Sequence, residues 1–138
     1  MTAIFSVTTL LNIDVDLRAP SGLPELLGSF GESIYPMNQH EGFASFEAAN
    51  TAAKTLEDIV GGLIKLVLEL PPEARNLWDS CESRCFDIGI QSAAEPYSIP
   101  FSLSQQAVAS LASVGAEIRI TVYGARLAKD WPGGEISN

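Results

Sequence analysis

Residues 4–17 alternate between apolar and polar side chains, and this period of two is the strongest constraint on the fold. Successive side chains of a strand point to opposite faces, so the pattern predicts one long strand with a buried face and a largely polar face. The expected buried face carries Phe5, Val7, Thr9, Leu11, Ile13, Val15 and Leu17, and the expected polar face carries Ser6, Thr8, Leu10, Asn12, Asp14 and Asp16. The chain is therefore expected to build a sheet covered on one side.

The rest of the chain mixes helical periodicity with short alternating stretches. We expect helices over residues 23–30, 51–70, 71–81 and 104–114, and strands over residues 42–47, 86–91 and 116–123. Ser104 is a suitable N-cap for the last helix, and Gly115 stands where a left-handed residue ends it. Residues 31–41 contain Pro36 and Asn38 and are expected to form turns.

The strands predicted over residues 4–17, 86–91 and 116–123 each have one apolar and one polar face. Strands of a parallel sheet covered on both sides would be apolar throughout. We therefore expect an α+β fold, a two-layer sandwich with a mainly antiparallel four-stranded sheet and helices packed on one face. Residues 1–124 are expected to form this single domain and residues 125–138 a C-terminal tail.

Charge and composition exclude several classes of protein. The hydrophobic fraction of 46% is too high for a disordered chain, and the net charge of −9 repels nucleic-acid backbones and anionic lipid. We therefore expect neither nucleic-acid nor membrane binding, while a basic protein would be attracted. The start of the chain has no basic region followed by a continuous apolar one, and no stretch resembles a membrane span, so we expect a cytoplasmic protein.

Catalytic and metal-binding motifs are sparse in the sequence. Cys81 and Cys85 lack the second ligand pair that zinc requires, so we expect free thiols, and His40 is the sole histidine. No glycine-rich phosphate loop and no nucleophile elbow occurs. We therefore expect no enzyme, no cofactor and no metal site. Asp14, Asp16 and Asp87 remain an alternative site for a hard cation or small molecule, and His40 remains a candidate for undetected acid–base chemistry.

The polar face of the predicted sheet is the least improbable functional surface, because it gathers carboxylates, amides and one tyrosine from three strands. We expect a partner to bind the residues that these strands place there, namely Asn12, Asp14, Asp87, Gln91, Glu117, Arg119 and Tyr123.

The C-terminal half resembles a bacterial domain of unknown function, the family numbered 4279. The resemblance rests on Phe86-Asp-Ile-Gly-Ile90, Pro100-Phe-Ser-Leu-Ser104 and Leu111-Ala-Ser-Val-Gly-Ala-Glu-Ile-Arg-Ile-Thr-Val-Tyr123, with a looser match from residue 3 onward. These are mostly capping and core positions, so the resemblance implies a fold and brings no catalytic residues. It also implies an association with immunity proteins of bacterial toxins.

The resulting hypothesis is a non-catalytic protein-binding domain, with an immunity protein that neutralises a basic bacterial toxin as its narrower form. Two alternatives stay open. One is a small-molecule or metal-ion binding module of a bacterial cytoplasmic pathway. The other is a homo-oligomeric structural domain, such as a homodimer paired through strand edges.

Overall fold

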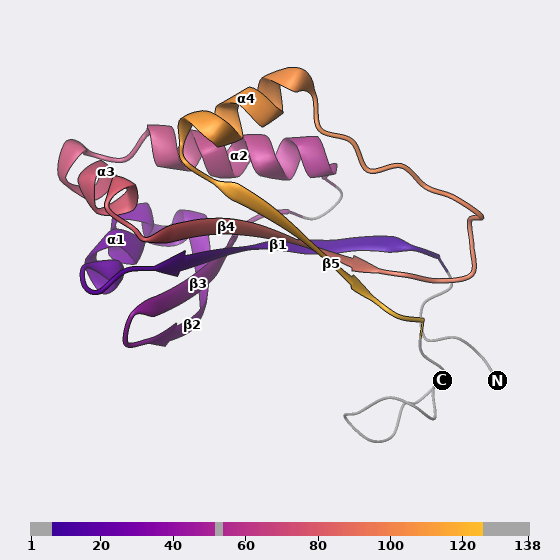
Figure 1. Ribbon diagram of the computed structural model, residues 1–138, viewed down its shortest axis with the longest axis horizontal. Helices are drawn as coiled ribbons and strands as arrows, with labels where there is room; N and C mark the ends of the chain where they lie inside the picture. Colours follow the sequence, from indigo (N-terminus) through magenta and orange to yellow (C-terminus); the bar gives the residue numbers. More distant parts are fainter. Residues whose placement is uncertain (1–6, 52–53, 126–138) are drawn as a thin grey trace.

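The computed structural model describes residues 7–51 and 54–125 and shows an α+β fold built on one sheet (Figure 1). The elements follow in the order β1 (Thr9–Arg18), α1 (Leu23–Phe30), a short 3₁₀ turn (Gly31–Ser33), β2 (Ile34–His40), β3 (Phe43–Ala48), α2 (Leu56–Leu68), α3 (Pro72–Asp79), β4 (Ser83–Gln91), α4 (Gln105–Ser113) and β5 (Glu117–Tyr123). The predicted tail lies outside the described residues except for Ala125.

The five strands lie in the order β2-β3-β1-β4-β5. β1 pairs antiparallel with β3 and with β4, and β2 pairs antiparallel with β3. β5 pairs parallel with β4, because α4 carries the chain back along the sheet between them. The predicted α+β class is confirmed, whereas the predicted count of four strands is wrong, since the sheet is mixed and has five.

β2 is the strand that the sequence did not predict. Its Pro36 and Asn38 are turn-forming residues, and the ladder with β3 is irregular between them. An edge strand tolerates proline and a bulge because one side of its backbone has no partner to satisfy. Local turn signals therefore gave the wrong prediction for residues 34–40.

A bulge in β1 reverses the predicted faces at its N-terminal end. Leu10 lies opposite Ile90 while Asn12 lies opposite Gly89, so Leu11 is the extra residue. Leu10 consequently packs against the core and Leu11 is 41% exposed, the opposite of the prediction. From Ile13 onward the alternation holds, and Ile13, Val15 and Leu17 are buried as predicted. Residues 4–6 lie outside the described residues.

The helices cover one face of the sheet, with α2 and α4 above it in Figure 1. Phe30 of α1 lies 5.1 Å, centroid to centroid, from Phe46 of β3 and meets Trp78 of α3 edge-on. The Trp78 indole donates to the backbone oxygen of Val114, so this buried polar group is satisfied. Gly115 adopts a φ of +70°, which confirms the predicted left-handed residue after α4. Across residues 7–51 and 54–125, no helix is long and apolar enough to cross a bilayer.

Candidate functional site

The candidate site is the outer face of the sheet, the face opposite the helices. The registers align one side chain from each of β3, β1, β4 and β5 in a row across this face. Asp14 of β1 lies opposite Asp87 of β4, which lies beside Arg119 of β5. On the other side of Asp14 comes Glu47 of β3, because Phe46 lies opposite Val15. We name Glu47, Asp14, Asp87 and Arg119 the acid row. It contains three carboxylates and one cation.

Asp14 occupies the position in the acid row that is least favourable for an ionised carboxylate. Burial, a shared hydrogen bond and the charge of Glu47, and the charges of Asp16 and Asp87 together raise the pKa of Asp14 from 3.8 to about 7. Its Oδ1 atom is inaccessible and has no hydrogen-bond partner among the described residues. With a pKa raised to about 7, the Asp14 carboxyl carries its proton in part of the molecules near neutral pH.

Arg119 forms ion pairs with two other carboxylates of this surface. Its guanidinium lies 3.4 Å from Asp16 and 3.6 Å from Asp87, and Thr121 donates to Asp87 at 2.7 Å. Burial and the charge of Asp87 raise the pKa of Asp16, and the charge of Arg119 opposes this rise. Arg119 thus serves two carboxylates, and among the described residues no cation pairs with Asp14 or Glu47.

Next to the acid row, Asn12 and Tyr123 flank a glycine. The Asn12 amide donates to Glu47. A Cβ atom added to Gly89 would lie 3.0 Å from Asn12 Oδ1 and 3.8 Å from Tyr123 Cε2, so both side chains lie over the bare backbone of Gly89. Tyr123 remains 51% exposed. This part of the surface offers an amide and an aromatic ring.

Two predicted partner-binding residues have different surroundings. Gln91 is 6% exposed, and its amide donates to the backbone oxygens of Ser92, Tyr123 and Gly124. Its side chain therefore holds the end of β5 by hydrogen bonds and is too buried to contact a partner. Glu117 is exposed and lies beside Cys85, one row away from Arg119. The structure brings Asn12, Asp14, Asp87, Arg119 and Tyr123 together, and places Glu117 at the margin.

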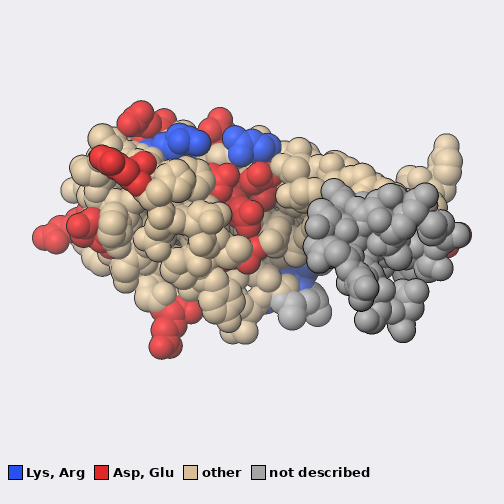
Figure 2. Space-filling view, turned by 90° about the horizontal axis from the view of Figure 1, so that it is seen from below, with Lys and Arg blue, Asp and Glu red and all other residues tan. Residues whose placement is uncertain are grey.

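Glu47 is the residue of the candidate site that the sequence did not single out. Its alternation with Phe46 in the predicted strand over residues 42–47 indicates an outward side chain. Nothing in the sequence, however, shows that β3 lies directly beside β1. The pairing of strands, which is a long-range property, is what gives Asp14 an acidic neighbour on each side. Figure 2 shows the result as a band of acidic side chains across the middle of this face, with basic atoms beside it.

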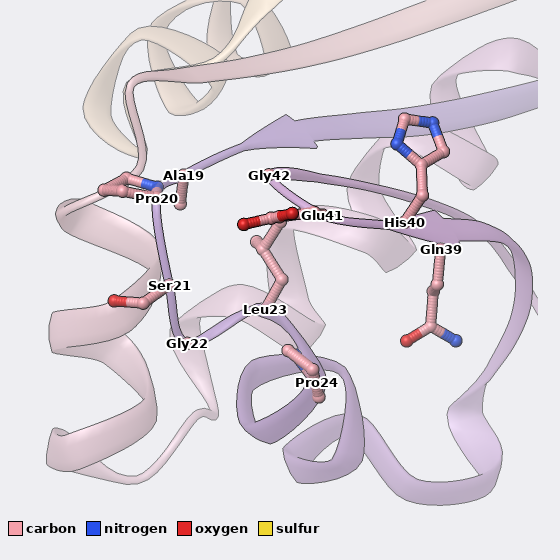
Figure 3. Close-up of a pocket in the computed structure, with 10 residues that line it drawn as sticks. All are labelled: Ala19, Pro20, Ser21, Gly22, Leu23, Pro24, Gln39, His40, Glu41 and Gly42. Carbon is pink, nitrogen blue, oxygen red and sulfur yellow. The ribbon is translucent and has the colours of Figure 1, made fainter.

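His40 lies at a different corner of the outer face. Its ring stacks on Phe43 with 4.9 Å between centroids, and the Arg18 guanidinium lies 5.0 Å from the centroid of that ring on β3. A neighbouring cavity of about 360 Å³ lies between residues 19–24 and residues 39–42. Figure 3 shows the Glu41 carboxylate extending into the space between these segments, whereas the His40 imidazole points away from it. No acid–base pair therefore converges on this cavity.

The described part of the chain contains no arrangement of side chains that suits a metal site or a reactive thiol. No three His, Cys, Asp or Glu side chains of residues 7–51 and 54–125 are grouped to hold a metal ion. Cys81 and Cys85 are free and buried, and burial is the main cause that raises the pKa of both thiols. Both side chains therefore stay protonated at neutral pH, which makes them poor nucleophiles and poor metal ligands.

Comparison of the chain with models of known families, with curated proteins and with solved structures finds no match. The resemblance to family 4279 stays a prediction.

Proposed function

We propose that this chain is a non-catalytic binding protein that holds a basic protein against the outer face of its sheet. The observation that carries the proposal is the acid row, where Asp14 and Glu47 face each other with no cation from the described residues, on the face opposite the helices. Such an arrangement is unfavourable in the free protein. A lysine or arginine from a partner would relieve it.

The proposed partner acts on Asp14 directly. A positive charge within about 4–6 Å favours the ionised carboxylate, so binding lowers the pKa of Asp14 and releases its proton. The net charge of −9 also attracts cationic proteins at long range, which raises their association rate at low salt. Tyr123 and Asn12 add an aromatic and an amide contact beside the charges, which suits a protein surface better than a free ion.

The narrower proposal is an immunity protein that neutralises a basic bacterial toxin. Its support is the resemblance to family 4279 together with the acidic face. A toxin gene directly upstream in the source genome is the expected observation, and an operon of metabolic enzymes there would argue for the small-molecule alternative.

The direct test uses the full chain as bait in a lysate of its source organism, with two matched double variants. Asp16→Asn with Asp87→Asn removes two charges from the outer face, and Glu69→Gln with Glu82→Gln removes two exposed charges elsewhere. We expect a basic protein to be captured by the wild type and by the second variant. The first variant should bind that protein at least about 10-fold more weakly, because it removes two of the carboxylates at the interface.

Two results contradict the proposal. One is that no basic protein is enriched even at low salt. The other is that both double variants weaken binding equally, since net charge alone and not the outer face would then govern capture. Circular dichroism of each variant shows that the fold is intact.

A further inference from the structure

β5 is an open edge of the sheet. It pairs with β4 on one side, and the strand order places no described strand on the other. Half of its backbone N–H and C=O groups therefore face away from the sheet, as they do on any edge strand. An open edge is a template for one more strand.

The side chains of β5 on the helix face are apolar and uncovered. Ile118, Ile120 and Val122, which we name the β5 stripe, are 40%, 60% and 59% exposed. Their direct neighbours in β4, Phe86 and Ile88, are 0% and 2% exposed. The helix layer therefore stops short of β5, and α4 packs against α2, burying Ala107 and Leu111. The apolar layer continues to the edge, and no described helix covers it there.

The opposite edge of the same sheet is protected. β2 contains Pro36, which has no N–H to donate, and its ladder is irregular between Pro36 and Asn38. Proline, bulges and polar side chains are the means by which natural edge strands avoid pairing with other chains. β5 has no proline, no glycine, no bulge and no lysine, and its apolar residues are the β-branched types that suit a strand. The two edges thus differ in a way that permits pairing at β5 alone.

We propose that β5 pairs antiparallel with β5 of a second copy of this chain, about a two-fold axis perpendicular to the sheet. Such an axis keeps both helix layers on the same side and joins the two sheets into one. The register centred on Ile120 uses all seven residues of the strand. It sets Ile120 opposite its own copy and Ile118 opposite the second copy's Val122. The β5 stripe is therefore complementary to itself.

The charges of β5 agree with this register. On the outer face it sets Glu117 opposite Tyr123 of the second copy and Arg119 opposite Thr121, so no like charges lie directly opposite one another. A register centred on Arg119 would place two guanidinium groups opposite each other. The charges of Glu117 and Arg119 also cancel within each strand. The edge strand therefore carries no net charge, although each chain carries −9.

The test is sedimentation velocity of the full chain at about 0.15 M salt, from about 5 to about 500 µM. Because a single strand pair is a small interface, we expect reversible dimerisation with a dissociation constant of about 10–100 µM. Ile120→Lys places two ammonium groups opposite each other in the apolar stripe and should weaken the dimer by more than about 30-fold. Met37→Lys, which adds the same charge at the exposed β2 edge, is the matched control and should change the dissociation constant by less than about 2-fold.

A second pair of variants does not depend on added charge. Ile120→Cys brings two thiols together at the two-fold axis, so oxidised glutathione should convert it to a disulfide-linked dimer much faster than it converts Met37→Cys. The native cysteines are buried and stay out of this reaction. The proposal is wrong if the chain remains monomeric at roughly 500 µM, the upper end of the concentration range. It is also wrong if the two cysteine variants form disulfide-linked dimers at equal rates.

Hydrogen exchange identifies the competing occupant. If the second copy covers β5, the amides of residues 117–123 gain protection as the protein concentration rises. If residues 126–138 of the same chain cover this edge instead, the protection is the same at every concentration, and the proposal is wrong.

Discussion

The acid row and the β5 stripe lie on neighbouring strands of one sheet, yet they can attract only different partners. In the acid row the Arg119 guanidinium pairs with Asp87 and also with Asp16 beside the row, and Asp14 Oδ1 has no hydrogen-bond partner among the described residues. In the β5 stripe three β-branched side chains stand exposed beside a backbone edge that pairs with no second described strand, and they carry no charge. The first surface needs a cation, and the second needs apolar area and a strand.

The difference shows how one small domain can keep two surfaces from competing. Net charge −9 favours a basic partner at the acid row but opposes the approach of a second copy, which is equally acidic. Pairing at β5 therefore depends on contacts that charge does not supply. Arg119 connects the two surfaces, since its backbone belongs to β5 and its guanidinium to the acid row.

The largest expected difference between the two surfaces is their response to salt. Raising NaCl from about 50 to about 500 mM should weaken binding of a decalysine peptide, used as a basic probe of the acid row, by about 100-fold, because salt screens exposed charges. The same change should alter the dissociation constant of the dimer by less than about 3-fold. The shift should be toward tighter association, since salt screens the repulsion between two acidic chains. Isothermal titration calorimetry and sedimentation velocity measure the two quantities. Parallel weakening of both would mean that the dimer is held by charge.

The sequence contains most of the local information behind these surfaces. Alternation over Ile13, Val15 and Leu17 correctly predicts the buried face of the central strand, and the outward positions of Asp14 and Asp16 follow from it. Each of these inferences needs only the neighbours of a residue along the chain, because strand periodicity is a local property.

What the sequence does not contain is the order of the strands and the breaks in their registers. Leu10 and Leu11 are both leucine, so alternation alone cannot show which of them enters the core, and the bulge decides it. Likewise Glu47 meets Asp14 only because β3 pairs with β1. The sequence therefore predicts the outward positions of the candidate site residues on one face, but it cannot predict the raised pKa of Asp14.

The next prediction concerns the proton held by the acid row. The pKa of Asp14 rises from 3.8 to about 7 on folding, so the folded chain binds this proton more tightly than the unfolded chain. The stability that this proton contributes is complete below about pH 4 and is lost as the pH rises through about 7. Asp14→Asn cannot lose a proton, so its free energy of unfolding relative to the wild type should rise by about 1 kcal/mol between pH 5 and pH 8, a value reduced for solvent screening of a half-buried group.

Urea denaturation at a series of pH values measures this difference. Asp79→Asn is the matched control, because Asp79 is an exposed carboxylate at the end of α3, far along the chain from the acid row, and should show no such trend. The dimer constant of Asp14→Asn should equal that of the wild type, since Asp14 lies two strands away from the β5 edge. A pH trend that Asp79→Asn shares would show that general charge repulsion causes it.

The smallest expected effect comes from Thr121, whose hydroxyl joins β5 to the acid row. Thr121→Val keeps the β-branched shape but removes the donor that lies 2.7 Å from Asp87, so the free energy of unfolding should fall by about 0.5–1 kcal/mol. Thr9→Val removes an exposed hydroxyl that bonds only to the nearby Val7 oxygen, and it should cost less. Because valine fits the strand as well as threonine does, the dimer constant should stay unchanged while decalysine binding changes slightly. If Thr121→Val instead alters dimerisation as strongly as stability, the acid row and the β5 stripe act as one coupled surface rather than two.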